Sequence, residues 1–170
     1  MINEKTTEAL QKEVGEGYKG ILYGGFMATA NGVKLIEYNA RLGDPEAMNV
    51  LTILKTDIID IFNSIGRGTL SELSIDFDNK ATVCKYAVPE GYPDKPIKGK
   101  KIDITSVSNK DSLFFASVDV EGDHLIEAGS RTVAVVGIAN SISQAEKIAE
   151  EEISKVCLLY TSPSPRDCKT

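Results

Sequence analysis

Residues 37–46 read Glu-Tyr-Asn-Ala-Arg-Leu-Gly-Asp-Pro-Glu, and the chain before this stretch predicts how it is held. Residues 18–30 are rich in the aromatic and branched side chains that favour β-strands. The dipeptide Asn31-Gly32 follows and suits a type I′ turn, whose twist matches two antiparallel strands. We therefore expect Val33–Asn39 to return as the second strand of a hairpin and to carry the stretch at its end.

The end of this second strand carries a pair of oxygen-bearing side chains. Successive side chains on a strand point to opposite faces, so Glu37 and Asn39 share one face while Ile36 and Tyr38 share the other. A carboxylate and an amide oxygen placed together suit Mg²⁺, which takes one or two protein oxygens and completes its shell with phosphate and water. The spacing predicts a metal-binding pair.

The residues after the strand suit anions. Arg41 offers a planar guanidinium that can hold a carboxylate or a phosphate in two parallel hydrogen bonds. Asp44 followed by Pro45 predicts a helix N-cap and a first helical residue, and helix N-termini attract anions. Taken one at a time, Glu37, Asn39, Arg41 and Asp44 could be ordinary solvated residues; their ordered combination favours a site.

The first part of the chain, residues 1–68, is expected to add helices to this hairpin. A short helix is predicted over residues 4–14, and helical chain from Pro45 to Ile65 is predicted to break at Lys55-Thr56-Asp57, with Thr56 as the second cap. Gly66 is expected to end it. The apolar residues of this stretch follow the spacing of a buried stripe; they are Val50, Leu51, Leu54, Ile58, Ile61, Phe62 and Ile65.

The second part, residues 69–156, alternates short apolar runs with turn residues and predicts an antiparallel sheet. The expected strands are residues 81–88, 112–120, 124–127 and 132–139. A capping box at Ser143–Glu146 and an apolar stripe predict a final helix that covers one sheet face. The fold class is therefore α+β. Residues 157–170, with their Ser and Pro, predict a non-native, disordered tail.

The composition excludes several classes of function. The formal net charge is −6, which disfavours nucleic acid as a partner, and we expect the cations at Lys98, Lys100 and Lys101 to form a solvated loop. Before the predicted tail Cys84 is the single cysteine, which agrees with a reducing compartment.

No apolar run long enough to span a membrane and no leader is found, so we expect a soluble, cytoplasmic protein. The single histidine, His124, lies at a predicted hairpin turn and is given no catalytic role.

Residues 18–27 and 37–46 resemble the end of the ATP-grasp domain in the phosphoribosylamine–glycine ligase family. The resemblance continues through Gly91-Tyr92-Pro93 and Ala128-Gly129-Ser130-Arg131 of the C-terminal domain, and so covers most of residues 15–156. It implies an α+β fold in which the hairpin and helices end an ATP-grasp domain and a small antiparallel sheet domain with a covering helix follows.

The resemblance also implies roles for individual residues. Glu37 and Asn39 match the pair that binds Mg²⁺ or Mn²⁺ on the ATP phosphates, and Arg41 and Asp44 match the part of the motif that lies against the substrates. Arg131 is a candidate nucleotide contact, although Ser130 stands where the family more often has a second Gly. The implied reaction joins glycine to 5-phosphoribosylamine through glycyl phosphate, with conversion of ATP to ADP, in purine biosynthesis.

The family has an N-terminal domain and a central ATP-binding region that this sequence does not contain. We therefore expect the chain to be a fragment that is inactive alone, with the missing N-terminal part of the same enzyme as its partner. Two other classes compete: another ATP-grasp enzyme, such as a relative of biotin carboxylase, and a non-catalytic binding module. The run Gly43-Asp44-Pro45-Glu46 favours the first class over the biotin carboxylase relatives, which follow their arginine with a different sequence.

Overall fold

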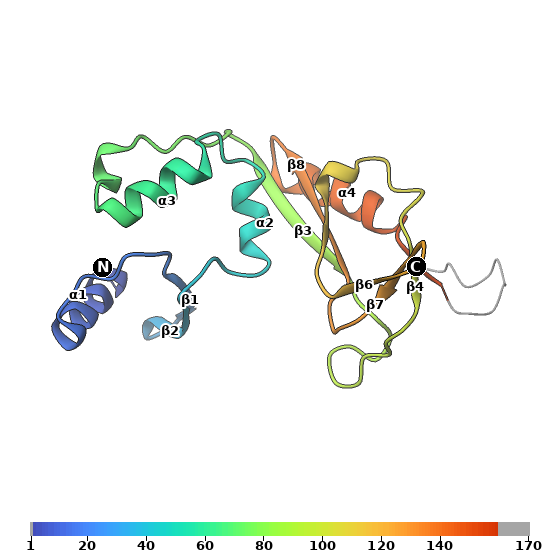
Figure 1. Ribbon diagram of the computed structural model, residues 1–170, viewed down its shortest axis with the longest axis horizontal. Coiled ribbons are helices and arrows are strands. Elements are labelled where there is room, and N and C mark those ends of the chain that lie inside the picture. The colour runs from blue at the N-terminus through green and yellow to red at the C-terminus, as the bar shows by residue number, and fades with distance from the viewer. Residues whose placement is uncertain (1, 160–170) are drawn as a thin grey trace. The chain divides into compact units, whose positions relative to one another are not determined.

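The computed structural model describes residues 2–159, which form two compact units. The first unit comprises residues 1–47 and 54–78. The second comprises residues 48–53 and the chain from Asn79 onward. Figure 1 shows the helices and strands of both units. No helix in the described part of the chain is both long and apolar enough to cross a bilayer.

The first unit contains helix α1 (Ile2–Val14), the antiparallel strands β1 (Tyr23–Thr29) and β2 (Gly32–Asn39), and helix α3 (Ile58–Arg67). Helix α1 is tied to β2 through the Tyr38 hydroxyl, which donates to Asn3 Oδ1 at 3.0 Å and lies 3.0 Å from Thr6 Oγ1. The predicted N-terminal helix and hairpin are therefore confirmed.

The turn of the hairpin differs from the predicted type I′. The two loop residues are Ala30 and Asn31, and Gly32 alone of this turn has a positive φ, at 94°. The Thr29 hydroxyl accepts the Asn31 N–H and donates to the Gly32 carbonyl. Asn31 therefore keeps a negative φ. The positive φ falls on Gly32, which adopts it without a steric cost because glycine has no Cβ.

Helix α2 (Glu46–Leu51) begins one residue after the predicted start, and the Asp44-Pro45 peptide before it is cis. The predicted break before α3 is present, but its N-cap is Asp57, which accepts the Ile59 N–H at 2.8 Å. Thr56 was the wrong candidate because its hydroxyl accepts the Asp76 N–H at 2.7 Å. The helix also continues past Gly66 to Arg67, and Gly68 caps it with a φ of 74°.

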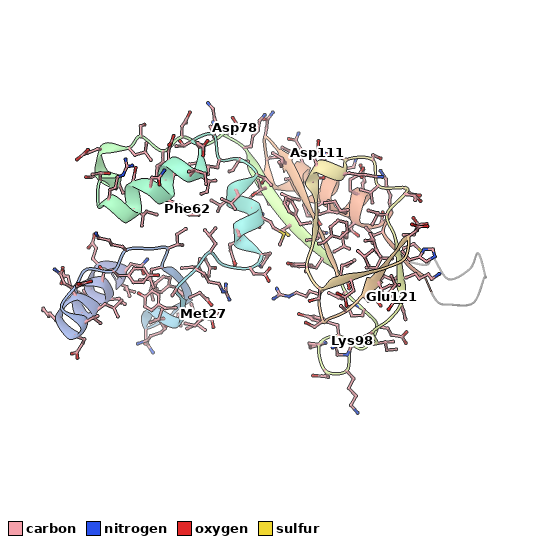
Figure 2. The ribbon with its side chains drawn as sticks, in the orientation of Figure 1. Met27, Phe62, Asp78, Lys98, Asp111 and Glu121 are labelled. Carbon is pink, nitrogen blue, oxygen red and sulfur yellow. The ribbon has the colours of Figure 1, made fainter. Side chains whose placement is uncertain are left out.

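The first unit has a small buried core. Among its described residues, only Gly43 and Ile61 are buried. The apolar stripe predicted for the two helices is only partly buried. Ile61 on α3 is buried and Leu54, Ile58 and Ile65 are half-buried, but Phe62 is 46% exposed. Figure 2 labels Phe62 on α3 and Met27 on β1, which is 54% exposed.

The second unit contains two antiparallel sheets, where the sequence predicted a single antiparallel sheet. One has the strand order β3 (Ala81–Ala87), β8 (Val133–Ala139), β5 (Leu113–Phe115). The other has the order β6 (Val118–Glu121), β7 (His124–Glu127), β4 (Lys101–Asp103), β9 (Cys157–Leu159). Short 3₁₀ turns cover Leu70–Glu72 in the first unit and Lys110–Ser112 in the second.

Three details of the second unit differ from the sequence predictions. The strand expected over residues 112–120 is divided at Ala116-Ser117 into β5 and β6, which belong to different sheets. Cys157–Leu159 were assigned to the tail but pair with β4, and the rest of the predicted tail lies outside the described residues. Lys100 is 8% exposed and contacts Glu90 at 3.3 Å, so it does not belong to a solvated loop as Lys98 does.

Helix α4 (Ile142–Ile153) covers one face of β3 and β8 (Figure 1). Its N-cap is Ser141, which accepts the Gln144 N–H, so the helix is capped two residues before the predicted Ser143. Ala145 and Ala149 are fully buried against β8, where Gly137 has no side chain to separate helix from strand. Lys85 of β3 pairs with Glu146 and Glu150 at the edge of this contact.

We predict that Gly137→Ala destabilises the second unit by about 1–3 kcal/mol or more, because a Cβ there would overlap the Ala145 carbonyl and lie 2.8 Å from the Ala149 nitrogen. Gly66→Ala is the contrasting variant, since a Cβ there meets nothing within 4 Å and alanine favours an exposed helix by about 0.5–1 kcal/mol. Urea unfolding monitored at β8 and α3 amides by NMR measures both. Equal effects of the two substitutions would contradict this packing.

Candidate functional site

The two predicted metal ligands lie side by side at the end of β2. Asn39 Nδ2 donates to Glu37 Oε1 at 3.2 Å, with Glu37 exposed and Asn39 half-buried. The Asn39 amide carries oxygen and nitrogen at equivalent positions, so a half-turn about its Cβ–Cγ bond would place its oxygen beside the carboxylate. The structure therefore brings these two side chains together at a surface that an ion can reach.

A bulge sets the direction of these side chains. The strand register shifts between Gly25 and Phe26: Gly25 pairs with Glu37, whereas Phe26 pairs with Leu35. Ile36 is thus the extra residue on β2, and such bulges bend a strand and re-aim the side chains beside them. The Phe26 ring also lies close to the backbone at Gly24, because a Cβ there would be 2.7 Å from this ring.

Tyr23 and Glu46 complete the arrangement next to the pair. Tyr23 lies directly across from Asn39 in the strand register, and its hydroxyl donates to Glu46 Oε1 at 2.8 Å. This hydrogen bond raises the pKa of Tyr23 above its ordinary 10.0, and partial burial and the charges of Glu46 and Glu37 act in the same direction. Gly43 is buried between them, since a Cβ there would lie 3.1 Å from the Tyr23 ring.

Arg41 and Asp44 are both exposed in the turn between β2 and α2. The Arg41 guanidinium donates through Nη1 to the Leu42 carbonyl at 2.8 Å, which holds it close to its own backbone. The Gly43 carbonyl accepts the Ala47 N–H at 2.8 Å and closes the first turn of α2. The decapeptide thus places a cation and a second carboxylate within a few residues of the Glu37–Asn39 pair.

Arg131, the fifth candidate, belongs to the second unit. It is half-buried, and its guanidinium carbon lies 5.2 Å from the centroid of the Tyr86 ring, a distance at which a cation and an aromatic face attract each other. His124 is exposed at the start of β7, beside the turn that the sequence predicted.

No group of three or more His, Cys, Asp or Glu side chains is gathered for a metal ion anywhere within residues 2–159. A hard cation such as Mg²⁺ needs few protein ligands, because it fills its remaining positions with phosphate oxygens and water. The Glu37–Asn39 pair offers it a carboxylate and an amide.

Comparison with known proteins identifies the class to which this arrangement belongs. Residues 1–47 match the family described as "Phosphoribosylglycinamide synthetase, ATP-grasp (A) domain", and residues 82–160 match "Phosphoribosylglycinamide synthetase, C domain". The hairpin and its motif are thus part of an ATP-grasp domain. The chain belongs to the phosphoribosylglycinamide synthetase family.

Curated relatives support this assignment over most of the chain. The chain is 53% identical to "Phosphoribosylamine--glycine ligase" of Methanococcus maripaludis over 155 residues, which cover 89% of this chain and 35% of the relative. It is also 53% identical to the protein of that name from Methanocaldococcus jannaschii, over 88% of this chain and 34% of the relative. The chain therefore spans about a third of the length of these relatives.

A solved structure agrees with the same assignment. The crystal structure of phosphoribosylamine–glycine ligase from Thermotoga maritima matches with a TM-score of 0.72 and 29% identity, over 85% of this chain and 36% of that one. The α+β fold class predicted from the sequence is therefore confirmed, and so is the resemblance on which the site prediction was built.

Sequence reasoning missed two residues of the site. Glu46 was quoted within the decapeptide without a role, and Tyr23 was assigned only to a strand. The signal was available in the hairpin register, because a strand that ends at Asn39 has its partner start near Tyr23. Their hydrogen bond could not be foreseen, since it depends on the turn that brings α2 back toward β1.

We predict that Glu46→Gln lowers the pKa of Tyr23 toward 10.0, because the variant removes both the carboxylate acceptor and its charge. Ultraviolet titration of the tyrosinate band measures this, and subtraction of the Tyr23→Phe spectrum isolates Tyr23. Glu13→Gln, on an exposed part of α1, is the matched control and leaves the titration unchanged. A Tyr23 midpoint that is identical in native chain and Glu46→Gln would contradict the contact.

Proposed function

We propose that this chain is the C-terminal part of an ATP-dependent ligase that joins glycine to 5-phosphoribosylamine to give glycinamide ribonucleotide through glycyl phosphate, in purine biosynthesis. The observation that carries the proposal is the accessible Glu37–Asn39 pair, which lies immediately before Arg41 and the Gly43–Glu46 turn. The identity to proteins named phosphoribosylamine–glycine ligase over nearly nine-tenths of the chain supports the same reaction.

The Glu37 carboxylate and the Asn39 amide oxygen are assigned to a divalent cation, Mg²⁺ or Mn²⁺, shared with the ATP phosphates. When bound, the cation neutralises charge on the phosphoryl oxygens. Glu37 supplies the negative charge and Asn39 a neutral oxygen, which leaves the cation a net positive charge toward the nucleotide. The hydrogen bond between Tyr23 and Glu46 keeps the Glu46 carboxylate engaged beside this pair.

Arg41 and Asp44 are assigned to the substrates. The reaction brings together a carboxylate and polyphosphate, which repel each other, so a positively charged fork in the turn lowers the electrostatic cost of their approach. Asp44 lies three residues after Arg41, where its carboxylate can accept a hydrogen bond from an amine or a hydroxyl. No protein nucleophile is required, because the carboxylate of glycine attacks the terminal phosphorus of ATP directly.

Arg131 is assigned to a nucleotide contact from the second unit. The rest of the ATP-binding machinery is assigned to an N-terminal part of the same enzyme. That part would also cover apolar side chains of the first unit, such as Ile36, which is 63% exposed, and Ile59, which is 59% exposed. The partners are then small molecules, and we propose the cytoplasm as the compartment in which they meet.

A chimera tests this function directly. The C-terminal third of the Methanocaldococcus jannaschii ligase is replaced by the present chain, and ADP formation is measured with and without glycine and 5-phosphoribosylamine. We expect glycine-dependent turnover, and Glu37→Gln in the chimera is expected to lower kcat/KM by roughly two orders of magnitude or more, since a metal on phosphoryl oxygens contributes several kcal/mol.

Glu13→Gln in the chimera serves as the matched control and retains full turnover, because Glu13 is an exposed acid outside the site. A well-folded chimera without glycine-dependent ADP formation would favour a non-catalytic module instead. Turnover that survives Glu37→Gln unchanged would remove the metal assignment while leaving the reaction in place.

A further inference from the structure

Residues 127–132 connect the two sheets of the second unit. At one end the Glu127 N–H donates to the Lys100 carbonyl, in line with β4. At the other end the Thr132 N–H donates to the Ala87 carbonyl, next to β3. Between these ends, Ser117 accepts the Ala128 N–H and donates its own N–H to the Arg131 carbonyl. The backbone of this segment is therefore fixed at three places.

The side chains of the two end residues are also linked. Thr132 is fully buried and its hydroxyl lies 3.5 Å from Glu127 Oε1, to which it donates. Glu127 is 1% exposed, and its Oε2 has no hydrogen-bond partner among the described residues. A buried carboxylate with an unsatisfied oxygen costs free energy, so its presence in this position requires a reason other than packing.

One charged group, Lys100, interacts with Glu127, and it also pairs with Glu90. Lys100 is itself buried and attracts the Glu127 carboxylate, while its ammonium group lies 3.3 Å from the more exposed Glu90. Burial raises the pKa of Glu127, and the charge of Lys100 and the hydrogen bond from Thr132 partly oppose this. The pKa of Glu127 is raised on balance, because desolvation outweighs the contributions of Lys100 and Thr132.

Arg131 is covalently bound to Thr132, so the position of Thr132 directly constrains where the Arg131 side chain begins. The guanidinium lies over Tyr86 on β3, and Tyr86 and Ala134 are cross-strand partners in the same sheet. We propose that Glu127 is a positioning residue: its hydrogen bond with Thr132 adds a side-chain link to the backbone hydrogen bonds of the segment that carries Arg131, and this link helps to hold the guanidinium over Tyr86.

The consequence for function rests on the proposed role of Arg131 in nucleotide binding. Protonation of Glu127 removes its electrostatic attraction to Lys100, and Lys100 stays paired with Glu90. Protonation also makes Glu127 a weaker acceptor for the hydrogen bond from the Thr132 hydroxyl. The segment then loses its side-chain link at Thr132, and the Arg131 guanidinium leaves the Tyr86 face for part of the time. The orientation of Arg131 follows the ionisation of a residue that does not touch it.

The test uses the full chain and NMR. The ring current of Tyr86 displaces the Arg131 Hδ signals, and we expect this displacement to diminish as the pH is lowered, with the same midpoint as the Glu127 Cδ signal. In Glu127→Gln the pH dependence is lost. In Thr132→Val the Glu127 titration persists but the Arg131 signals no longer follow it, because the link is removed while the charge remains. Glu121→Gln, at an exposed position on β6 that Figure 2 labels, changes neither.

Arg131 signals that do not depend on pH in the native chain would overturn the proposal. Arg131 signals that titrate equally in the native chain and in Thr132→Val would also overturn it, because they would report only the electric field of Glu127. The native titration and the Thr132→Val variant test the proposal even where Glu127→Gln does not fold.

In the active chimera, Glu127→Gln is expected to raise KM for ATP several-fold with little change in kcat. Absence of turnover in every chimera contradicts the proposed function, whereas the NMR result stands on its own.

Discussion

The register of the β1–β2 hairpin is the constraint on which the candidate site depends. Because side chains alternate along a strand, a slip of one residue would turn Glu37 and Asn39 to the opposite face. The pairing of Tyr23 with Asn39 and the shift between Gly25 and Phe26 fix this register. The Phe26 and Tyr38 rings, 6.2 Å apart and perpendicular, pack together within the hairpin and reinforce it.

The two units rely on different sources of order. In the second unit, α4 lies directly on the backbone of β8 at Gly137, and Val133–Val136 are almost fully buried. The first unit holds its hairpin mainly through polar contacts of Tyr38 with α1 and of Tyr23 with Glu46. A two-stranded hairpin is marginally stable by itself, so a site on this hairpin depends on such contacts and on whatever covers its exposed apolar side chains.

The sequence predicted the elements well and their ends less well. Periodicity and turn residues located the hairpin, the helices and most strands. The caps were misplaced because neighbouring residues satisfy the same local pattern. Thr56 and Asp57 are both good N-caps, but the Thr56 hydroxyl accepts the Asp76 N–H, and Asp57 therefore caps the helix. The run over residues 112–120 reads as one strand, and only the pairing of β5 with β8 and of β6 with β7 divides it.

For the site, adjacency along a strand was sufficient to bring Glu37 and Asn39 together, whereas Glu46 required knowledge of the turn. The burial of Lys100 and Glu127 could not be predicted from the sequence, because charged side chains are mostly exposed. These two are buried where distant segments of the chain meet, and the Glu127 N–H donates to the Lys100 carbonyl.

The most direct measurement is an anomalous-scattering map at the manganese edge, from crystals of the chimera grown with Mn²⁺ and a non-hydrolysable ATP analogue. We expect a peak within about 2–2.5 Å of Glu37 and Asn39 oxygens, the range for hard cations and oxygen ligands, and in contact with the nucleotide phosphates. Manganese bound to the nucleotide without contact to either side chain would contradict the central claim.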